Sequence, residues 1–371
     1  MLIYMSLLAG ALALGILLCR NKKGNLIYCI VMGIAMFVIA SLRRSVGHDY
    51  NNYALMYMRS MTFDIEEIAV QRTEKGYSII TKLLADYFYD YQTIFIVCAA
   101  FFAVCVAVAA YKYCKRPYLG ICFFLTFGVY FNTFNFLRQE IAGFIVFFAI
   151  MHCVKKDQFF RFCIMVLLAS CFHLSAILMI PFYFLLKIKL TPVTLGIYGG
   201  LTVLIYIFSW NIMDFITDYI YKQYQPRTSV HVLHGFDPSY LIFSIIAFVA
   251  AYVFRRRLIE KDPFNDVLIS CMFFSLFFEV IGIKHAIVSR MGAYVILPAV
   301  VVLMPRIFEA ALEKCREAAK SDKKRRTLFT AVTVASFAVV CTTMYGLMIV
   351  KDYNGVTPYT TVFDEFETQE W

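Results

Sequence analysis

Charged residues are scarce in this chain. They make up 16% of its 371 residues, whereas 61% are hydrophobic and 17% aromatic; a soluble domain has about a quarter charged residues. So little charge cannot cover the surface of a soluble domain, which excludes a soluble globular protein. The formal net charge of +10 comes from short clusters between apolar runs, so we expect no nucleic-acid partner. The sequence therefore predicts a protein that crosses a membrane several times.

Signatures of ATP use, metal binding and secretion are also missing. There is no glycine-rich phosphate-binding loop. Most of the twelve cysteines lie inside apolar runs without paired ligand spacing, as is typical of small buried hydrophobic residues. His231 and His234 are three positions apart but lack a third ligand, so we predict no metal and no cofactor. Residues 2–19 have neither a basic leader nor a cleavage site, which indicates a first span.

Apolar runs that approach the roughly 20 residues needed to cross a bilayer recur along the whole chain. They lie at residues 2–19, 26–42, 93–111, 118–132, 139–154, 193–210, 239–254, 266–282, 287–304 and 328–350. The predicted fold is all-α: a polytopic transmembrane helical bundle of about ten crossings, forming a single integral membrane domain over residues 1–371.

The distribution of Lys and Arg predicts the orientation. Most of the 35 basic residues lie in one set of short loops and in segment 305–326, which the positive-inside rule assigns to the cytoplasm. We expect 305–326 to be a basic helix held at anionic lipid. Both termini and the large loops 43–92 and 211–238 then lie outside.

Segment 162–186 does not fit a simple crossing. The positive-inside rule assigns the basic loops before and after it both to the cytoplasm. A segment of 25 residues is long enough for only one straight span, which would place these loops on opposite sides of the membrane. We expect two short half-helices that enter the membrane and return, with the reversal between Ser170 and Ser175. The alternative is one long span and a wrongly assigned loop elsewhere. Irregular backbone at membrane depth is tolerated where it lines a protein cavity.

Outer loop 43–92 contains a predicted amphipathic helix that begins near Glu74. Its apolar residues recur at helical spacing, which is typical of a helix lying in the membrane interface. They are Tyr77, Ile80, Leu84, Tyr87, Phe88 and Tyr91, whereas Lys82, Asp86 and Asp90 lie off this stripe.

Arginines at the outer ends of the predicted spans are the main candidates for binding. Positive charge is disfavoured on this face, and the guanidinium group matches phosphate oxygens with a planar set of donors. They are Arg43 and Arg44 in the polar stretch 42–53, Arg138 and Arg290. The sequence does not choose between Arg43 and Arg44. For Arg138 the alternative is an interfacial residue paired with Glu140.

His173 lies at the predicted reversal of segment 162–186. Its neutral imidazole would act as a base or orient a sugar hydroxyl; the alternative is a structural hydrogen-bond donor. Asp49 lies close to Arg43 and Arg44 in sequence. We therefore interpret it as a partner that orients these arginines rather than as a metal ligand.

At these residues the sequence resembles the EpsG family of Wzy-like bacterial polysaccharide polymerases. The matching motifs occur in the family's order along nearly the whole chain. They are Arg43 with Val46, Gly47, Asp49, Tyr50 and Tyr53; Glu74, Gly76 and Tyr77; Arg138, Gln139 and Ala142; Phe172, His173, Ser175 and Ala176; Arg290 and Tyr294; and Pro358 and Tyr359. His48 stands where the family more often has threonine, which argues against an essential role for it.

The resemblance implies a GT-C-related glycosyltransferase of the bacterial plasma membrane. Its substrates would be undecaprenyl-diphosphate-linked glycans, both donor and acceptor, joined outside the membrane into exopolysaccharide or capsule. Arg43, Arg138 and Arg290 would stabilise the departing diphosphate, and His173 would lie near the acceptor hydroxyl. The other matching residues would bind substrate, namely Arg44, Asp49, Tyr50, Tyr53, Glu74, Tyr77, Gln139, Ser175 and Tyr294. A flippase, a chain-length regulator and membrane lipid are the implied partners.

Two alternatives remain. A flippase or exporter of lipid-linked oligosaccharides would place its basic residues deep in the membrane, whereas here they gather at outer helix ends. A membrane O-acyltransferase would need a histidine near the cytoplasmic face, where His152 lacks polar neighbours.

Overall fold

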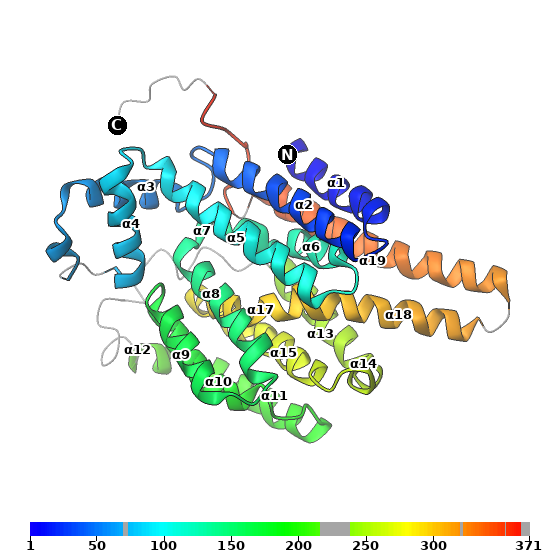
Figure 1. The fold of residues 1–371 in the computed structure, drawn as a ribbon. Helices are drawn as coiled ribbons and strands as arrows, with labels where there is room; N and C mark the ends of the chain where they lie inside the picture. Colours follow the sequence, from blue (N-terminus) through cyan, green and yellow to red (C-terminus); the bar gives the residue numbers. More distant parts are fainter. Residues whose placement is uncertain (70–72, 216–237, 320–321, 353, 365–371) are drawn as a thin grey trace. The chain divides into compact units, whose positions relative to one another are not determined.

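The computed structural model describes residues 1–69, 73–215, 238–319, 322–352 and 354–364. Within these ranges the regular structure is helical, with a single isolated bridge between Arg43 and Thr361 (Figure 1). The all-α prediction is therefore confirmed. His231, His234 and most of loop 211–238 lie outside the described residues.

Six helical stretches are long and apolar enough to cross a membrane. They are α2 (Lys22–Leu42), α5 (Gln92–Tyr113), Leu137–Val154, which contains α8 (Leu137–Ala149), α15 (Asn265–Gly282), Ile287–Ala318, which ends in α18 (Met304–Ala318), and Lys324–Lys351, within α19 (Lys323–Lys351). Two bent pairs bring the count to eight in the described residues. They are α6 (Pro117–Thr126) with α7 (Val129–Asn135), bent by 57°, and α11 (Pro192–Ile207) with α12 (Ser209–Phe215), bent by 68°.

The sequence predicts about ten crossings, two more than the eight candidate spans of the described residues. The helix α1 (Leu2–Leu18) has 17 residues, and the apolar part of α13 (Pro238–Val253) is Leu241–Val253. Both are shorter than the roughly 20 residues that a straight span needs. Hydropathy finds these runs, but the residues at which a helix ends depend on local capping and packing.

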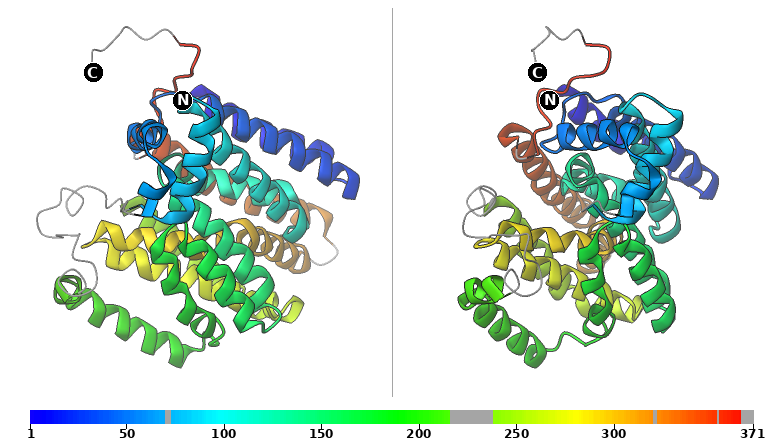
Figure 2. Two further views of the ribbon diagram at one scale, coloured as in Figure 1. Left: turned by 60° about the vertical axis from the view of Figure 1, so that its left-hand side comes forward. Right: turned by 90° about the vertical axis from the view of Figure 1, so that its left-hand side faces the viewer.

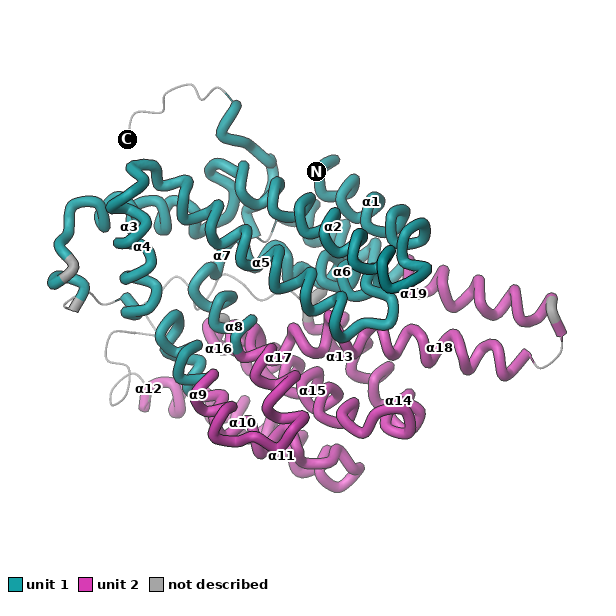
Figure 3. The backbone as a smooth tube through the Cα atoms, viewed as in Figure 1, with its two compact units in different colours: residues 1–145, 166–177, 339–371 teal, residues 146–165, 178–338 magenta. Residues whose placement is uncertain are grey.

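The chain divides into two compact units (Figure 3). The first comprises residues 1–145, 166–177 and 339–371, and the second residues 146–165 and 178–338. In the first unit α2 and α5 lie side by side, and α1 packs on α6 (Figures 1 and 2). In the second unit α15 is central and packs against α11, α13, α14 (Arg255–Lys261) and α17 (Ala293–Leu297).

The segment predicted to enter and return forms a helical hairpin. Its helices are α9 (Phe159–Ser170), followed by the short turn η3 (Leu174–Leu178) and α10 (Met179–Leu185). Phe159, at the start of α9, contacts Tyr183 and Phe184, at the end of α10, with ring centroids 5.0 Å apart in each pair. The two ends of the segment are therefore together, and the chain reverses at Cys171–His173, inside the predicted window.

The helix expected after Glu74 is α4 (Lys75–Tyr87). Its buried face holds Tyr77, Ser78, Thr81, Lys82 and Ala85. Half of the predicted apolar stripe, namely Ile80, Tyr87 and Phe88, is exposed. The ammonium group of Lys82 pairs with Asp86 at 2.6 Å. Ile79, Ile80, Leu83 and Tyr87 are exposed, so α4 presents an apolar outer surface while it packs on α3 (Tyr50–Thr62).

The predicted basic segment 305–326 is α18 together with the start of α19. Arg306 is paired with Asp262 at 3.2 Å and bonded to Asn265 at 2.6 Å. Lys261 pairs with Glu313, and Arg257 pairs with Glu317 at 2.6 Å. Ion pairs therefore join α18 to α14 and to Asp262 just after it, and the hydrogen bond from Arg306 joins α18 to the start of α15 within the second unit.

Candidate active site

Glu74 is the centre of a polar cluster in the first unit. It occupies the position before the first turn of α4. One carboxylate oxygen accepts a hydrogen bond from Arg138. The other lies 3.0 Å from Nδ1 of His173 and accepts the backbone N–H of Leu174 at 3.2 Å. Residues from three distant parts of the sequence thus meet at one carboxylate.

Gly76 explains how α4 and the hairpin tip come so close. Its N–H donates to the carbonyl of Cys171 at 2.9 Å. A Cβ at this position would lie 2.7 Å from the same carbonyl oxygen, a separation that a side chain cannot adopt without moving the backbone. The glycine therefore lets the first turn of α4 contact the tip and brings Glu74 beside His173.

Arg138 lies at the start of α8 and completes the cluster. Burial raises the pKa of the Tyr53 hydroxyl, and the adjacent Arg138 guanidinium partly offsets this rise. Tyr53 in turn packs against Tyr77 with ring centroids 5.9 Å apart. The alternative pairing of Arg138 with Glu140 is not formed: Glu140 is fully buried, and its carboxyl has no hydrogen-bond partner in the described part of the chain. Helix residues two positions apart point to different sides.

The electrostatics fix the protonation of Glu74. Burial raises the pKa of its carboxyl, but the hydrogen bond from His173 and the charge of Arg138 outweigh this and lower it from 4.5 to about 2. Glu74 is therefore ionised at neutral pH. Since a carboxylate can only accept hydrogen bonds, Nδ1 of His173 must donate.

The pairing with Glu74 leaves Nε2 of His173 able to accept a proton. In a neutral imidazole with the proton on Nδ1, Nε2 is an acceptor. The side chains of His173 and Arg138 are 29% and 28% exposed, against 15% for Glu74. The two groups that could meet a substrate are thus accessible, while the carboxylate that orients them is largely covered. An imidazole and a guanidinium held on either side of one carboxylate can remove a proton and stabilise a nearby anion.

Arg43 occupies a structural position instead of facing this cluster. It is buried, and its guanidinium donates to the carbonyls of Phe134 at 2.8 Å and Val46 at 3.3 Å. The Phe134 ring lies 4.3 Å from the guanidinium carbon, a favourable cation–π arrangement. This geometry favours a role in holding the backbone over direct contact with substrate. Arg44 is half-buried, and its backbone N–H donates to Thr360 at 3.0 Å.

The rest of the polar stretch 42–53 holds helix ends and the C-terminal segment together. Gly47 has φ +103°, and its N–H donates to the carbonyl of Gly355 at 2.7 Å. Asp49 lies before α3 and accepts from Asn52 at 3.3 Å. The hydroxyl of Tyr50 donates to Gln92 at 2.7 Å, and its ring stacks on Phe95 at 4.1 Å. These residues position the start of α3, from which Tyr53 reaches the cluster.

Gln92 is a residue that the sequence analysis missed. Its amide donates to the carbonyls of Ser41 at 2.7 Å and Arg43 at 3.0 Å, and its oxygen accepts from Tyr50. It therefore joins the end of α2 to the start of α5. The available signal was a polar residue at the first position of an apolar run.

The remaining predicted site residues have varied positions. Gln139 is buried in α8, and Ser175 is half-buried in η3. In the second unit Arg290 is exposed on the turn η6 (Arg290–Gly292), whereas Tyr294 is fully buried in α17. Among the residues that the structure describes, no three His, Cys, Asp or Glu side chains are grouped as a metal ion would require.

The helices and the cluster define a polytopic helical membrane protein with a polar site beside its helix ends. The chain belongs to the EpsG family, whose sequence model matches residues 26–361. This confirms the resemblance found in the sequence and links the protein to exopolysaccharide biosynthesis. No curated protein and no solved structure shows significant similarity to the chain.

Proposed function

We propose that this protein is a membrane glycosyltransferase. It joins undecaprenyl-diphosphate-linked oligosaccharide units into exopolysaccharide or capsule on the outer face of the bacterial plasma membrane. The observation that carries the proposal is the pairing of Glu74 with both His173 and Arg138. The cluster offers a proton acceptor and a cation side by side, and transfer of a glycan from a diphosphate carrier needs both.

The proposed reaction uses each member of the cluster once. Nε2 of His173 takes the proton of the acceptor hydroxyl, whose oxygen attacks the anomeric carbon of the growing chain. The bond from this carbon to the diphosphate oxygen breaks, and the lipid diphosphate leaves with the electron pair. Arg138 stabilises the negative charge on the leaving group. Glu74 stabilises the imidazolium that forms, as a buried carboxylate does in catalytic triads, and the proton then passes to water.

The proposed membrane arrangement follows the charges of the sequence. About ten crossings, with the short helices α1 and α13 counted as spans where the bilayer is locally thinner, leave both termini outside. The hairpin of α9 and α10 is then re-entrant, with His173 at its tip toward the outer half of the bilayer. A lipid-linked substrate would reach such a site sideways from the membrane. The flippase and the chain-length regulator implied by the family would act before and beside this protein.

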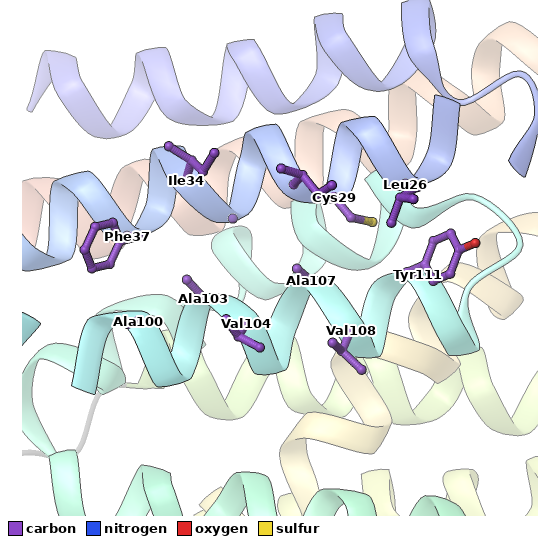
Figure 4. Close-up of a pocket in the computed structure, with 12 residues that line it drawn as sticks. Leu26, Cys29, Ile34, Phe37, Ala100, Ala103, Val104, Ala107, Val108 and Tyr111 are labelled. Atoms are coloured by element: carbon purple, nitrogen blue, oxygen red, sulfur yellow. The ribbon is translucent and has the colours of Figure 1, made fainter. Parts of the chain in front are cut away.

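An apolar groove between α2 and α5 supports a lipid-linked substrate. It has a volume of about 410 Å³ and is lined by side chains such as Ile34, Phe37 and Val104 (Figure 4). Small residues of both helices, namely Gly33, Ala103 and Ala107, form part of its lining. Since both helices are candidate spans, the groove is suited to a polyisoprenoid chain, which needs apolar walls and no hydrogen bonds.

Filling this groove should weaken substrate use. Ala107→Phe adds a ring where the chain would lie, and each displaced CH₂ group forfeits about 0.8 kcal/mol. We expect the lipid-linked substrate concentration for half-maximal rate to rise about tenfold or more, measured with purified protein and a defined substrate. Val97→Phe, at an exposed position of α5 outside the groove, is the control. An unchanged substrate requirement in Ala107→Phe would show that the groove does not bind the substrate tail.

A strain that lacks the gene distinguishes the polymerase from the flippase alternative. Surface polysaccharide and lipid-linked intermediates would be compared in this strain, with and without a restored Arg138→Ala copy. Loss of the long-chain ladder, while single repeat units still reach the outer face, is expected for a polymerase. Arg138→Ala should fail to restore the ladder, because removing one such donor typically costs about 10²–10³ in rate. Repeat units that accumulate inside would identify a flippase and contradict the proposal.

A further inference from the structure

A second pocket lies between α3 and α4, next to the Glu74 cluster. Its volume is about 280 Å³, close to the lower end of the range of about 300–1,000 Å³ for small-molecule sites. Thr73 and Tyr77 form part of its wall. These residues precede and follow Glu74 along the chain, so the pocket and the cluster share a wall within the first unit.

The lining of this pocket is polar with aromatic sides. Hydroxyl groups come from Ser60, Ser78 and Thr81, and rings come from Phe63 and Tyr77. Ser60 and Thr81 donate to backbone carbonyls of their own helices. The Ser78 hydroxyl has no hydrogen-bond partner among the described residues, although the residue is only 5% exposed. A buried hydroxyl without a partner costs about 1–3 kcal/mol, so a ligand hydroxyl that bonds to it would relieve this cost.

Arg59 adds a positive charge to the same pocket. It lies in the last turn of α3, and its side chain is exposed. Its backbone carbonyl accepts from the Thr62 hydroxyl at 2.8 Å, but its guanidinium makes no hydrogen bond or ion pair with the part of the chain that the structure describes. Several other arginines in this protein are paired with a carboxylate or a carbonyl, as Arg138 and Arg43 are. A guanidinium that has no partner among the described residues, beside aromatic and hydroxyl groups, is suited to a ligand that carries both hydroxyls and an anionic group.

We infer that this pocket binds an acidic sugar, a single saccharide residue bearing a carboxylate, within the lipid-linked glycan. The inference rests on the proposed function, because the adjoining Glu74 cluster is where the glycosidic bond would form. Along α4 the pocket residues Tyr77 and Thr81 lie about one to two turns, roughly 5–10 Å, beyond Glu74. The pocket is therefore placed to hold a sugar close to the reacting one and to select repeat units by charge.

Binding can be measured without turnover. Full-length protein in lipid nanodiscs would be titrated with glucuronate, glucose and inorganic phosphate, and contact followed by ligand-observed NMR. We expect glucuronate to bind more tightly than glucose. Arg59→Gln should weaken glucuronate binding about tenfold or more, because a hydrogen bond to a charged group is lost. Ser78→Ala should weaken both sugars, and Arg20→Gln, which removes an equal charge at an exposed position outside the pocket, should weaken neither.

The possible results test the acidic-sugar pocket separately from the proposed polymerase activity. Glucuronate binding that Arg59→Gln leaves unchanged would overturn the inference. Phosphate binding that depends on Arg59, without glucuronate binding, would also overturn it and assign the site to a diphosphate or a lipid headgroup. If the gene-deletion strain shows a flippase while Arg59-dependent glucuronate binding is retained, the proposed polymerase fails but the acidic-sugar site stands.

Discussion

Replacing His173 by alanine should lower the rate of polymer formation by about 10²–10⁴-fold. Glu74 holds the proton of this imidazole on Nδ1, 3.0 Å away, so Nε2 is left as the acceptor that activates a sugar hydroxyl. Alanine removes the acceptor without enlarging any side chain in the cluster. The rate would be measured with purified protein and a lipid-linked repeat unit, from the appearance of products longer than one unit.

The matched control is His48→Thr. His48 is exposed and stands where the family more often has threonine, so this variant should retain the rate of the parent protein. The His173→Ala protein should still be produced in the membrane at normal levels, because the side chain is partly exposed. A rate within a few-fold of the parent would mean that His173 is a structural donor to Glu74 and that another group removes the proton.

The spans could be predicted from the sequence because each is a local pattern. Apolar runs such as 26–42 and 93–111 correspond to α2 and α5 within a few residues. The hairpin of α9 and α10 was also predictable, since the basic loops on either side constrained where the chain could go. Helix ends were harder, because hydropathy does not show where the last turn is capped. The runs at 2–19 and 239–254 therefore counted as full spans in the sequence.

The members of the cluster were predictable one at a time, but their pairing was not. Glu74 is 64 residues from Arg138 and 99 from His173, and it meets both because α4 contacts the hairpin tip at Gly76. The nearest carboxyl in sequence, that of Glu140, points elsewhere. Long-range packing decides such pairs, and a single sequence does not contain that information.

Arg43 illustrates the opposite difficulty. A sequence shows an arginine at a helix end, which suggests an anion site, but not that carbonyls of Val46 and Phe134 already receive its hydrogen bonds. The residues that resemble the family motifs therefore fall into two groups, those in the polar cluster and those that make structural contacts. Glu74, Arg138 and His173 meet at one carboxylate, whereas Gly47, Tyr50 and Tyr359 make contacts to backbone or to neighbouring helices.

Replacing Glu74 by glutamine should be as damaging as the loss of His173, with a rate lower by about 10²–10⁴-fold. An amide can donate as well as accept, so it no longer fixes the proton on Nδ1; in a serine protease the equivalent change lowers the rate about 10⁴-fold. Arg138 would also lose its counter-ion. Glu67→Gln, at an exposed position of the same segment 43–92, should leave the rate unchanged.

The same variant tests the electrostatics of the cluster through stability. The pKa of Glu74 is about 2 in the folded protein and 4.5 ordinarily, so its ionised form stabilises the fold by an amount fully present above about pH 4.5. That contribution, on the order of 2–3 kcal/mol, is lost as the pH falls toward 2. Thermal unfolding of the detergent-solubilised protein should therefore show Glu74→Gln less stable than the parent at pH 7, with the difference shrinking below pH 4.5. An equal difference at pH 7 and pH 3 would mean that Glu74 acts through packing, and the assignment of the Nδ1 proton to His173 would lose its basis.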